Sequence, residues 1–303
     1  MNTSAVTPHH LEYFEDRVDF FQLFQFYPFL ENFYFEFEKQ FNPGPVAMKM
    51  KANPHIPIII SIAYLLFCYF GPKVMAKRDA FDLRTPLTLW NLFLSAFSFI
   101  GVIRVVPHMF FILKEYGFYE IVCQNPRAMY GCGAAGLWVQ LFILSKIPEL
   151  FDTYFIVVRK KPLIFLHWYH HVSVLLFCWN SYVTETGMGI FFVAMNYSVH
   201  AIMYLYYALV AMKIRLKILP PWIITTAQIS QMFAGITICC LSVYFMQHNE
   251  CEGIQVTNLA AGAVMYGTYL ALFLEFAVKK YIFSGKKRKA KGNKEEDNKA
   301  KTD

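Results

Sequence analysis

Apolar residues gather in long blocks along this chain, and several blocks are long enough to cross a lipid bilayer. Stretches such as IPIIISIAYLLFCYF and LTLWNLFLSAFSFIGVI approach the roughly 20 apolar residues that a membrane-spanning helix needs. The hydropathy pattern predicts seven helical spans, at 55–76, 87–107, 134–158, 162–182, 188–211, 222–246 and 257–282. The third block is the least regular, because charged residues interrupt it. The sequence therefore predicts an all-α, polytopic membrane protein.

The two ends of the chain differ from the block of spans at 55–282. Residues 1–54 begin polar and acidic, without the basic start and apolar run of a signal peptide. Within them, FQLFQFYPFL is aromatic-rich but short, which predicts a segment at the membrane interface, with a helix as one form, rather than a span. Residues 283–303 are rich in lysine and low in complexity, so we expect a disordered basic tail.

Basic residues favour alternate loops, and this bias predicts the orientation of the chain. Lysines and arginines occur between spans one and two, three and four, and five and six, and again in the tail KKRKAKGNK. The intervening loops contain few of them, and the N-terminal segment is acidic. By the positive-inside rule the basic loops are cytosolic. The N-terminus is then lumenal and the C-terminus cytosolic, as an odd number of spans requires.

The composition supports a membrane protein and argues against nucleic-acid binding. Hydrophobic residues make up 56% and charged residues only 16% of the chain, against about a quarter charged in soluble proteins. The net charge of +7 lies on the predicted cytosolic loops and tail. Basic patches beside spans normally face anionic lipid or anionic soluble ligands, so membrane lipid is the expected partner there.

Short signals near the termini and in the loops agree with a lumenal N-terminus. Asn2 begins a glycosylation sequon, and Lys299 and Lys301 match the dilysine retrieval pattern of endoplasmic-reticulum membrane proteins. Three of the seven cysteines fall near predicted lumenal loops: Cys123, Cys132 and Cys251. An oxidising lumen favours one disulfide bond, between Cys251 and either Cys123 or Cys132. The preferred pair is Cys123 with Cys251, and the alternative is that all these thiols stay free.

Ionisable residues inside spans are costly, so each set of them raises a functional-site hypothesis. In KIPELFDT, steps of three place Lys146, Glu149 and Asp152 on one face of a helix. The structural alternative is an ion pair between the lysine and a carboxylate that joins two helices. In HWYHH the histidines stand at i, i+3 and i+4 and also share a helical face. They are His167, His170 and His171.

Two further polar sets follow in the next two spans. In NYSVHAIMYLYY the polar positions at helical spacing are Asn196, His200, Tyr204 and Tyr207. In TTAQISQ they are Gln228 and Gln231. Packing between helices explains each set taken singly, and buried glutamines join helices as readily as they line a cavity. All four sets, however, fall at cytosolic or central depth in consecutive spans, which predicts one shared cavity open to the cytosol.

The histidines favour acyl chemistry over a metal centre. Desaturases and hydroxylases hold two irons with histidine boxes, but only His200 and the three histidines of HWYHH lie at the right depth here. Four imidazoles suffice for one zinc and not for two irons with open positions. Apolar surroundings disfavour the charged imidazole and leave it nucleophilic, so that it can attack a thioester and carry the acyl group. Basic residues at the cavity mouth suit coenzyme A phosphates; they are Arg159, Lys160 and Lys161.

The four motifs, in this order and over nearly all the spans, resemble the ELO/ELOVL family of fatty acid elongases, the membrane 3-oxoacyl-CoA synthases. The tryptophan of HWYHH, the N-terminal FEFEKQF and the lumenal MQHNEC resemble the branch that lengthens palmitate-range saturated and monounsaturated chains. The resemblance implies seven helices around an acyl-chain tunnel that opens to the cytosol. It implies condensation of acyl-CoA with malonyl-CoA in the endoplasmic reticulum membrane, with release of carbon dioxide and coenzyme A and no further cofactor.

The resemblance also assigns roles to residues of this chain. It implies that His170 carries the acyl group, that His200 assists decarboxylation or the second half-reaction, and that the other two box histidines position groups or exchange protons. It places along the tunnel Lys146, Glu149, Asp152, Asn196, Tyr204, Tyr207, Gln228 and Gln231. The implied partners are elongation-cycle reductases, a dehydratase and a second copy in a homodimer. The alternatives are a seven-span lipid transporter or receptor that only binds, and a metal-dependent lipid oxidase.

Overall fold

A computed structural model describes residues 7–13, 16–214, 220–248, 251 and 253–283. The predicted glycosylation site at Asn2, the retrieval lysines Lys299 and Lys301, and the predicted disordered tail from residue 284 onward lie outside the described residues.

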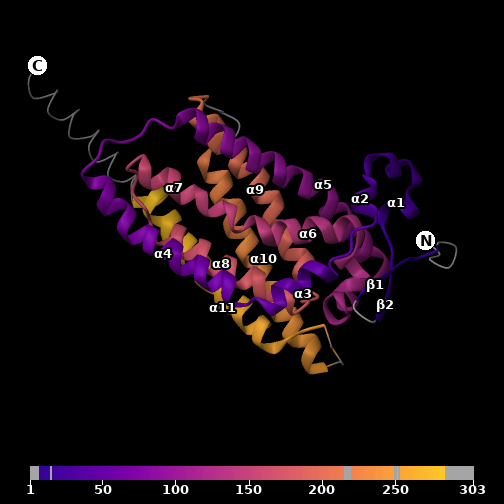
Figure 1. The fold of residues 1–303 in the computed structure, drawn as a ribbon. Helices are drawn as coiled ribbons and strands as arrows, with labels where there is room; N and C mark the ends of the chain where they lie inside the picture. Colours follow the sequence, from indigo (N-terminus) through magenta and orange to yellow (C-terminus); the bar gives the residue numbers. More distant parts are fainter. Residues whose placement is uncertain (1–6, 14–15, 215–219, 249–250, 252, 284–303) are drawn as a thin grey trace, which may run out of the picture.

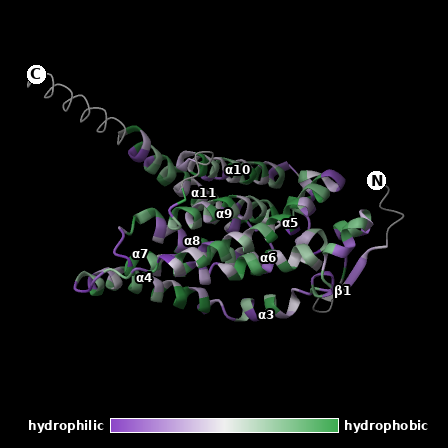
Figure 2. Cartoon of the chain, turned by 90° about the horizontal axis from the view of Figure 1, so that it is seen from above, coloured by the Kyte–Doolittle hydropathy of each residue, from purple (hydrophilic) through white to green (hydrophobic). Residues whose placement is uncertain are grey.

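A bundle of long helices forms the body of the molecule, with small N-terminal elements at one end (Figure 1). The bundle helices are α4 (His55–Ala76), α5 (Arg84–Cys123), α6 (Gly133–Ser145), α7 (Phe151–Val158), α8 (Phe165–Val183), α9 (Gly189–Ala211), α10 (Pro221–His248) and α11 (Val256–Ala277), and a π-helical turn, η5 (Val278–Phe283), extends α11. The loops that join α4 to α5 and α7 to α8 lie at the opposite end from the N-terminal hairpin (Figure 2). Most predicted spans thus coincide with a helix of the bundle.

The chain is a multi-pass membrane protein. Among the described residues, five helices are long and apolar enough to cross a bilayer: α4, α5, α9, α10 and the α11–η5 helix. The remaining two predicted spans are the interrupted α6–α7 segment and α8, which has 19 residues and carries the three box histidines. Their polar content lowers their hydropathy, so composition alone does not establish these two as spans.

Helix α5 continues well past the predicted end of the second span at residue 107. Its 40 residues pass through Pro107 and end at Cys123. The regular helical backbone breaks instead at Gly117, where φ is 84°, a value that glycine adopts without the steric cost of a side chain. The predicted boundary was therefore too early, because the proline and the charges that follow it do not end this helix.

The third predicted span is not one continuous helix. Helix α6 ends at Ser145, a 3-10 turn (η4, Pro148–Leu150) follows, and α7 then begins at Phe151. Pro148 cannot donate a backbone hydrogen bond, and its ring disfavours a continued helix through this point. The three charged residues of KIPELFDT therefore do not lie on one continuous α-helix, although Lys146 and Glu149 remain neighbours at i and i+3 and form an ion pair.

The N-terminal segment contains a β-hairpin that the sequence analysis did not predict. Strands β1 (His9–Tyr13) and β2 (Asp16–Phe20) pair antiparallel, with His9 opposite Phe20. Short helical turns follow, and they are α1 (Leu23–Phe26), η2 (Pro28–Phe33), α2 (Glu36–Lys39) and α3 (Gly44–Ala52). Helix α1 lies within the stretch for which an interfacial segment was predicted, and η2 begins in that stretch and extends past its end.

A buried carboxylate ties this N-terminal segment to the bundle. Glu38 is 1% exposed; Arg104 of α5 donates to both its oxygens at 3.0 and 2.9 Å, and Trp138 of α6 donates at 2.8 Å. Burial alone would raise the pKa of Glu38, but the hydrogen bonds from Arg104 and Trp138 outweigh it and hold that pKa below its usual value. The Arg104 guanidinium also lies over the Tyr34 ring, 4.5 Å from its centre. These contacts fix α2 against α5 and α6.

A disulfide joins the end of α5 to the segment before α11. Cys123 and Cys251 are bonded, with their Cα atoms 4.4 Å apart, and this is the pair that the sequence analysis preferred. Cys132 is free and buried, and burial raises its pKa to about 12, so that it stays a thiol. The bridge closes a separation of 128 residues at the same end of the bundle as the N-terminal elements.

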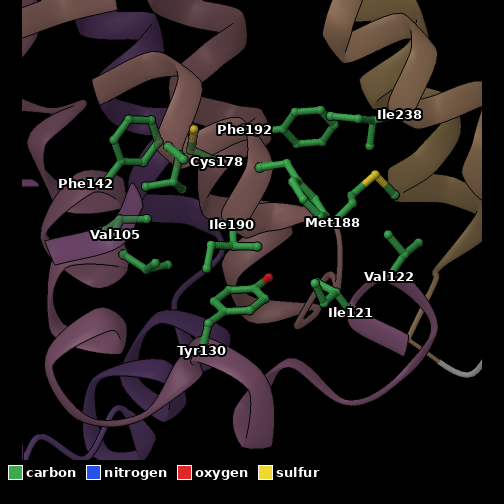
Figure 3. Close-up of a cluster of buried hydrophobic side chains, with 14 of the residues drawn as sticks. Val105, Ile121, Val122, Tyr130, Phe142, Cys178, Met188, Ile190, Phe192 and Ile238 are labelled. Atoms are coloured by element: carbon green, nitrogen blue, oxygen red, sulfur yellow. The ribbon is translucent and has the colours of Figure 1, made fainter. Parts of the chain in front are cut away.

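The core lies between α5, α6, α8, α9, α10 and α11, and Figure 3 shows part of it. Figure 3 shows Ile190 beside Tyr130, with Val105 and Phe142 on the other side of the cluster. Helices α5 and α9 approach closely because Gly101 has no side chain: an added Cβ would meet the Tyr197 ring at 2.5 Å. This tight packing gives α9 a fixed position from which it presents its polar residues.

Candidate active site

A cavity of about 440 Å³ opens at the end of the bundle that carries the basic loops, opposite the hairpin. It takes side chains from the start of α5, from α7, from the first turn of α8 and from the last turns of α9. Its polar and charged lining residues are Arg84, Asn91, Asp152, Arg159, Lys161, His167, Tyr204, Tyr207 and Lys213. The described residues thus place members of three of the four polar sets around one space.

Asp152 organises the wall of this cavity. Trp90 donates its indole N–H to Oδ1 at 2.7 Å, and the Tyr204 hydroxyl donates to Oδ2 at 2.8 Å. These two bonds link α5, α7 and α9 across the cavity. A carboxylate that accepts a directed bond at each oxygen is held in one orientation, so the site is preorganised on this side.

His167 is held by a relay of hydroxyl groups. Its Nε2 lies 2.9 Å from Thr153 Oγ1, and Thr153 Oγ1 lies 2.7 Å from the Tyr64 hydroxyl on α4. Thr153 is fully buried, so this relay is sheltered from bulk water. The arrangement fixes the ring of His167 at the cavity.

The other two box histidines lie behind His167 on α8. The ring centres of His167 and His171 are 4.5 Å apart, and those of His170 and His171 are 5.5 Å apart. His171 Nδ1 is buried and has no hydrogen-bond partner among the described residues. Such an orphaned polar atom is rare in a folded protein and marks a place where another group belongs.

His170 contacts α11 through its backbone and its ring. The Tyr269 hydroxyl donates to the His170 carbonyl at 3.2 Å, and the two ring centres are 5.1 Å apart. Tyr269 also lies within 2.6 Å of Ser173 Oγ. Within the part of the chain that the structure describes, neither ring nitrogen of His170 is engaged by a protein group in a hydrogen bond. Both nitrogens are therefore available for chemistry.

Lys146 and Glu149 form a buried ion pair at the break between α6 and α7. Lys146 Nζ lies 2.7 Å from Glu149 Oε1, and the side chains are only 2% and 5% exposed. Ser145 donates to the same oxygen at 2.7 Å, and Lys146 reaches Asn196 Oδ1 on α9 at 3.4 Å. The ion pair that was the structural alternative is thus present, and it places a cation beside α9.

The remaining predicted site residues lie on α9 and α10. His200 is 8% exposed, with its ring centre 5.2 Å from that of Tyr204, so it lies next to the Asp152 network. Gln228 donates to Met203 Sδ at 3.4 Å, and Gln231 is buried and interacts with Tyr266 on α11. The two glutamines therefore join helices in this structure, which is the alternative that the sequence left open.

The basic loop after α7 divides between two surfaces. Arg159 and Lys161 line the cavity, but Lys160 has a left-handed backbone (φ of 54°) and its Nζ lies against the carbonyl oxygens of Ala76 and Arg78. The expectation that all three residues serve the cavity mouth is therefore corrected: Lys160 points away. Arg84, at the start of α5, and Lys213, which follows α9, complete the positive rim.

Sequence reasoning missed several residues of the site. Trp90, Tyr64 and Tyr269 each make a hydrogen bond to a motif residue or its backbone, and each sits in an otherwise apolar span. A single aromatic residue with a polar tip in a span gives no spacing signal, so only the folded chain reveals these contacts. Among the described residues, no cluster of three His, Cys, Asp or Glu side chains has the arrangement of a metal site.

Comparisons with known proteins agree with these motifs. The profile of the GNS1/SUR4 family matches residues 49–290. "Very long chain fatty acid elongase 6" of Gallus gallus is 42% identical over 257 residues, which cover 85% of this chain and 95% of that protein. The Homo sapiens protein of the same name is 42% identical over 255 residues (84% and 94%). "Fatty acid elongase 3" of Trypanosoma brucei brucei is 39% identical over 260 residues (77% and 86%).

Proposed function

The chain belongs to the GNS1/SUR4 family of fatty acid elongases, and from this membership we propose that it condenses a long-chain acyl-CoA with malonyl-CoA. The product is a 3-oxoacyl-CoA two carbons longer, formed in the endoplasmic reticulum membrane with the basic end of the bundle facing the cytosol. Saturated and monounsaturated acyl chains are the proposed substrates. Two observations support this: HWYHH, FEFEKQF and MQHNEC resemble that branch of the family, and two relatives named very long chain fatty acid elongase 6 are 42% identical.

The observation that carries this proposal is the histidine cluster behind the cation-lined cavity. His170 has both ring nitrogens unengaged, and its neighbour His171 has an orphaned Nδ1. The cavity rim supplies Arg84, Arg159 and Lys213, whose charges suit the phosphates of coenzyme A. A nucleophile placed beyond an anion-binding mouth fits a substrate with a polyphosphate head and a thioester.

In the first half-reaction, a ring nitrogen of His170 attacks the thioester carbonyl carbon. An N–C bond forms, the C–S bond breaks, and coenzyme A leaves as a thiolate that takes up the proton released from the ring. His171, whose ring is next to that of His170, is placed to relay this proton, and His167 passes it toward the cavity. The product is an acyl-imidazole on α8.

In the second half-reaction, malonyl-CoA replaces coenzyme A in the cavity. Its terminal C–C bond breaks with release of carbon dioxide, and the electron pair left on the carbon forms a bond to the acyl carbonyl as the N–C bond to His170 breaks. The leaving ring nitrogen takes up one proton from water, which regenerates neutral His170. His200 lies on α9 beside the Tyr204 ring, and in this proposal it stabilises the enolate oxygen. Tyr204 does not share this role, because its hydroxyl proton is donated to Asp152. Other enzymes, two reductases and a dehydratase, must then process the 3-oxo group; we also propose a homodimer.

A condensation assay tests this proposal. Purified protein is incubated with radiolabelled malonyl-CoA and a panel of acyl-CoAs that differ in length and unsaturation. We expect label in a 3-oxoacyl product two carbons longer, with stoichiometric carbon dioxide. Saturable acyl-CoA binding without any incorporation would instead support a lipid transporter or receptor.

The positive rim gives a prediction about substrate affinity. Replacing Arg159 by alanine is expected to raise the KM for both CoA substrates by about tenfold with little change in kcat, because a cation at the mouth binds ground state and transition state alike. Steady-state kinetics in detergent measure this. The matched control is Lys160→Ala: this neighbouring side chain points away from the cavity, so its KM should match the wild type. Equal effects of the two substitutions would refute the assigned mouth.

A second, smaller cavity gives a prediction about which acyl-chain length the protein prefers. It has a volume of about 70 Å³ and lies near the hairpin end. Its lining includes Ile143, Tyr182 and Val193, and Ile143 precedes Lys146 by about one helical turn. We propose that it receives the methyl end of the acyl chain. Val193→Phe should then shift the preferred acyl-CoA to shorter chains, with about a tenfold loss of kcat/KM for the longest substrate, and Val193→Ala should shift it to longer ones.

The acyl-CoA panel assayed above measures this shift. Ile202→Phe is the control, because Ile202 lies on the same helix with 50% of its surface exposed to the surroundings of the bundle. An unchanged chain-length profile in both Val193 variants would place the methyl end elsewhere.

A further inference from the structure

A groove of about 760 Å³ lies outside the candidate active site, between α4 and the α7–α8 segment. Its walls are mainly apolar, and its lining residues are Leu65, Cys68, Tyr69, Pro72, Met75, Ala76, Val157, Lys160, Lys161, Pro162, Leu163 and Trp168. Leu65 and Tyr69 are 38% and 60% exposed, so the groove opens sideways to the surroundings of the bundle. Its volume is within the range of about 300–1,000 Å³ that ligand sites commonly have.

The groove has the length of one membrane leaflet. From Leu65 to Ala76 helix α4 rises by about 16 Å at 1.5 Å per residue, and one leaflet of a hydrocarbon core of about 30 Å measures about 15 Å. It begins at the basic end of the bundle, next to the loop after α4, and ends near mid-depth. One acyl chain of a membrane lipid matches this run.

Positive charge is concentrated at the open end of the groove. Lys160 and Lys161 belong to its lining, which contains no Asp or Glu. Lys160 Nζ contacts only neutral carbonyl oxygens, those of Ala76 at 3.5 Å and Arg78 at 3.1 Å, and within the described ranges neither lysine has a salt bridge. Lys73 lies at the same level, 3.4 Å above the Tyr69 ring. The rim is thus a set of cations without carboxylate partners among the described residues.

We propose that this groove binds one anionic phospholipid of the leaflet at the basic end of the bundle. Its phosphate lies against Lys160 and Lys161, and one acyl chain runs along Leu65, Cys68 and Tyr69. A lysine near the membrane surface attracts anionic lipid electrostatically, and burial of the acyl chain against the apolar wall adds to this attraction. The site does not depend on the proposed condensation, since the groove opens to the bilayer and not into the cavity of the histidines.

The lipid site also adjoins the active-site mouth. Lys161 lines both the groove and the cavity, so a bound lipid phosphate and a coenzyme A phosphate approach opposite sides of one short loop. Lys160 belongs to the groove alone. This separation lets one substitution test the lipid site without altering a residue assigned to substrate binding.

Native mass spectrometry of the full-length purified protein tests the proposal. The protein is mixed with phosphatidylserine or phosphatidylcholine of identical acyl chains, and the retained lipid is counted. We expect one tightly held phosphatidylserine and weaker phosphatidylcholine. Lys160→Gln should weaken phosphatidylserine retention about fivefold, which is the size of effect expected for one lysine near an anionic headgroup. The effect on phosphatidylcholine should be smaller, because its choline already balances the charge of its phosphate. Leu65→Trp should weaken both lipids by filling the groove.

Matched controls lie on the same helix or loop. Ile59→Trp changes an α4 side chain that is 59% exposed and lies outside the groove. Lys77→Gln removes a positive charge that follows the groove residue Ala76 but does not line the groove. Both variants should retain the two lipids as the wild type does. Equal retention of the two lipids, or equal effects of Lys160→Gln and Lys77→Gln, would overturn the proposal. Complete displacement of phosphatidylserine by coenzyme A, or a dimer that Leu65→Trp dissociates, would assign the groove to another occupant and overturn it too.

Discussion

Replacing His170 by alanine is expected to abolish condensation, with a loss in kcat on the order of 10⁴-fold or more. The reason is that the first half-reaction then lacks the atom that takes the acyl group from the thioester. In the proposed mechanism the two neighbouring histidines only relay protons, so neither His167 nor His171 replaces the missing nucleophile. Turnover of purified protein with radiolabelled malonyl-CoA measures the loss.

His200→Ala is the informative control for this substitution. It removes a buried histidine at the same level of the bundle but, in the proposed mechanism, leaves the first half-reaction intact. We therefore expect release of one equivalent of coenzyme A from acyl-CoA in His200→Ala and none in His170→Ala. Condensation that survives in His170→Ala, from protein that still binds acyl-CoA, would remove His170 from the role of nucleophile.

The buried pair of Lys146 and Glu149 gives the largest expected effect on stability. Glu149→Leu leaves the Lys146 ammonium without its partner in a site that is 2% exposed, and we expect a loss of about 3–5 kcal/mol in the free energy of unfolding. The double variant Lys146→Met/Glu149→Leu should regain most of this loss, because it removes the uncompensated charge as well. Equilibrium unfolding in mixed micelles measures both variants.

Activity separates the structural role of this pair from a chemical one. The stable double variant should still lose condensation, because Lys146 also contacts Asn196 and supplies the only ammonium at that depth among the described residues. Glu36→Gln, at an exposed pair with Lys39, serves as the control and should change neither stability nor activity. Full activity of the double variant would show that the pair only joins helices.

Hydropathy predicted most of the helical bundle, and its errors have physical causes. The spans that became α4, α9, α10 and α11 are long and apolar, so their position follows from composition. The end of α5 was missed because the span predicted from hydropathy stopped at residue 107, whereas the regular helix breaks only at Gly117. The hairpin of residues 9–20 was missed because its strands show no strong alternation, and its pairing depends on contacts with the folded chain.

The site was predictable where residues are close in sequence and not where they are far apart. Helical spacing put the three box histidines on one face, and α8 does carry them together. It could not show that Trp90 bonds Asp152 across 62 positions, nor that consecutive residues Arg159 and Lys160 point to different surfaces. Those relations depend on the fold: a left-handed backbone at Lys160 turns its side chain away.

The acyl-enzyme itself is the most direct test of the proposed mechanism. Protein is incubated with acyl-CoA in the absence of malonyl-CoA, and its intact mass and proteolytic peptides are then measured. The mechanism predicts one added acyl group on His170, which malonyl-CoA removes as a 3-oxoacyl product two carbons longer. Product formation without any covalent adduct, or an adduct confined to another residue such as His200, would contradict it.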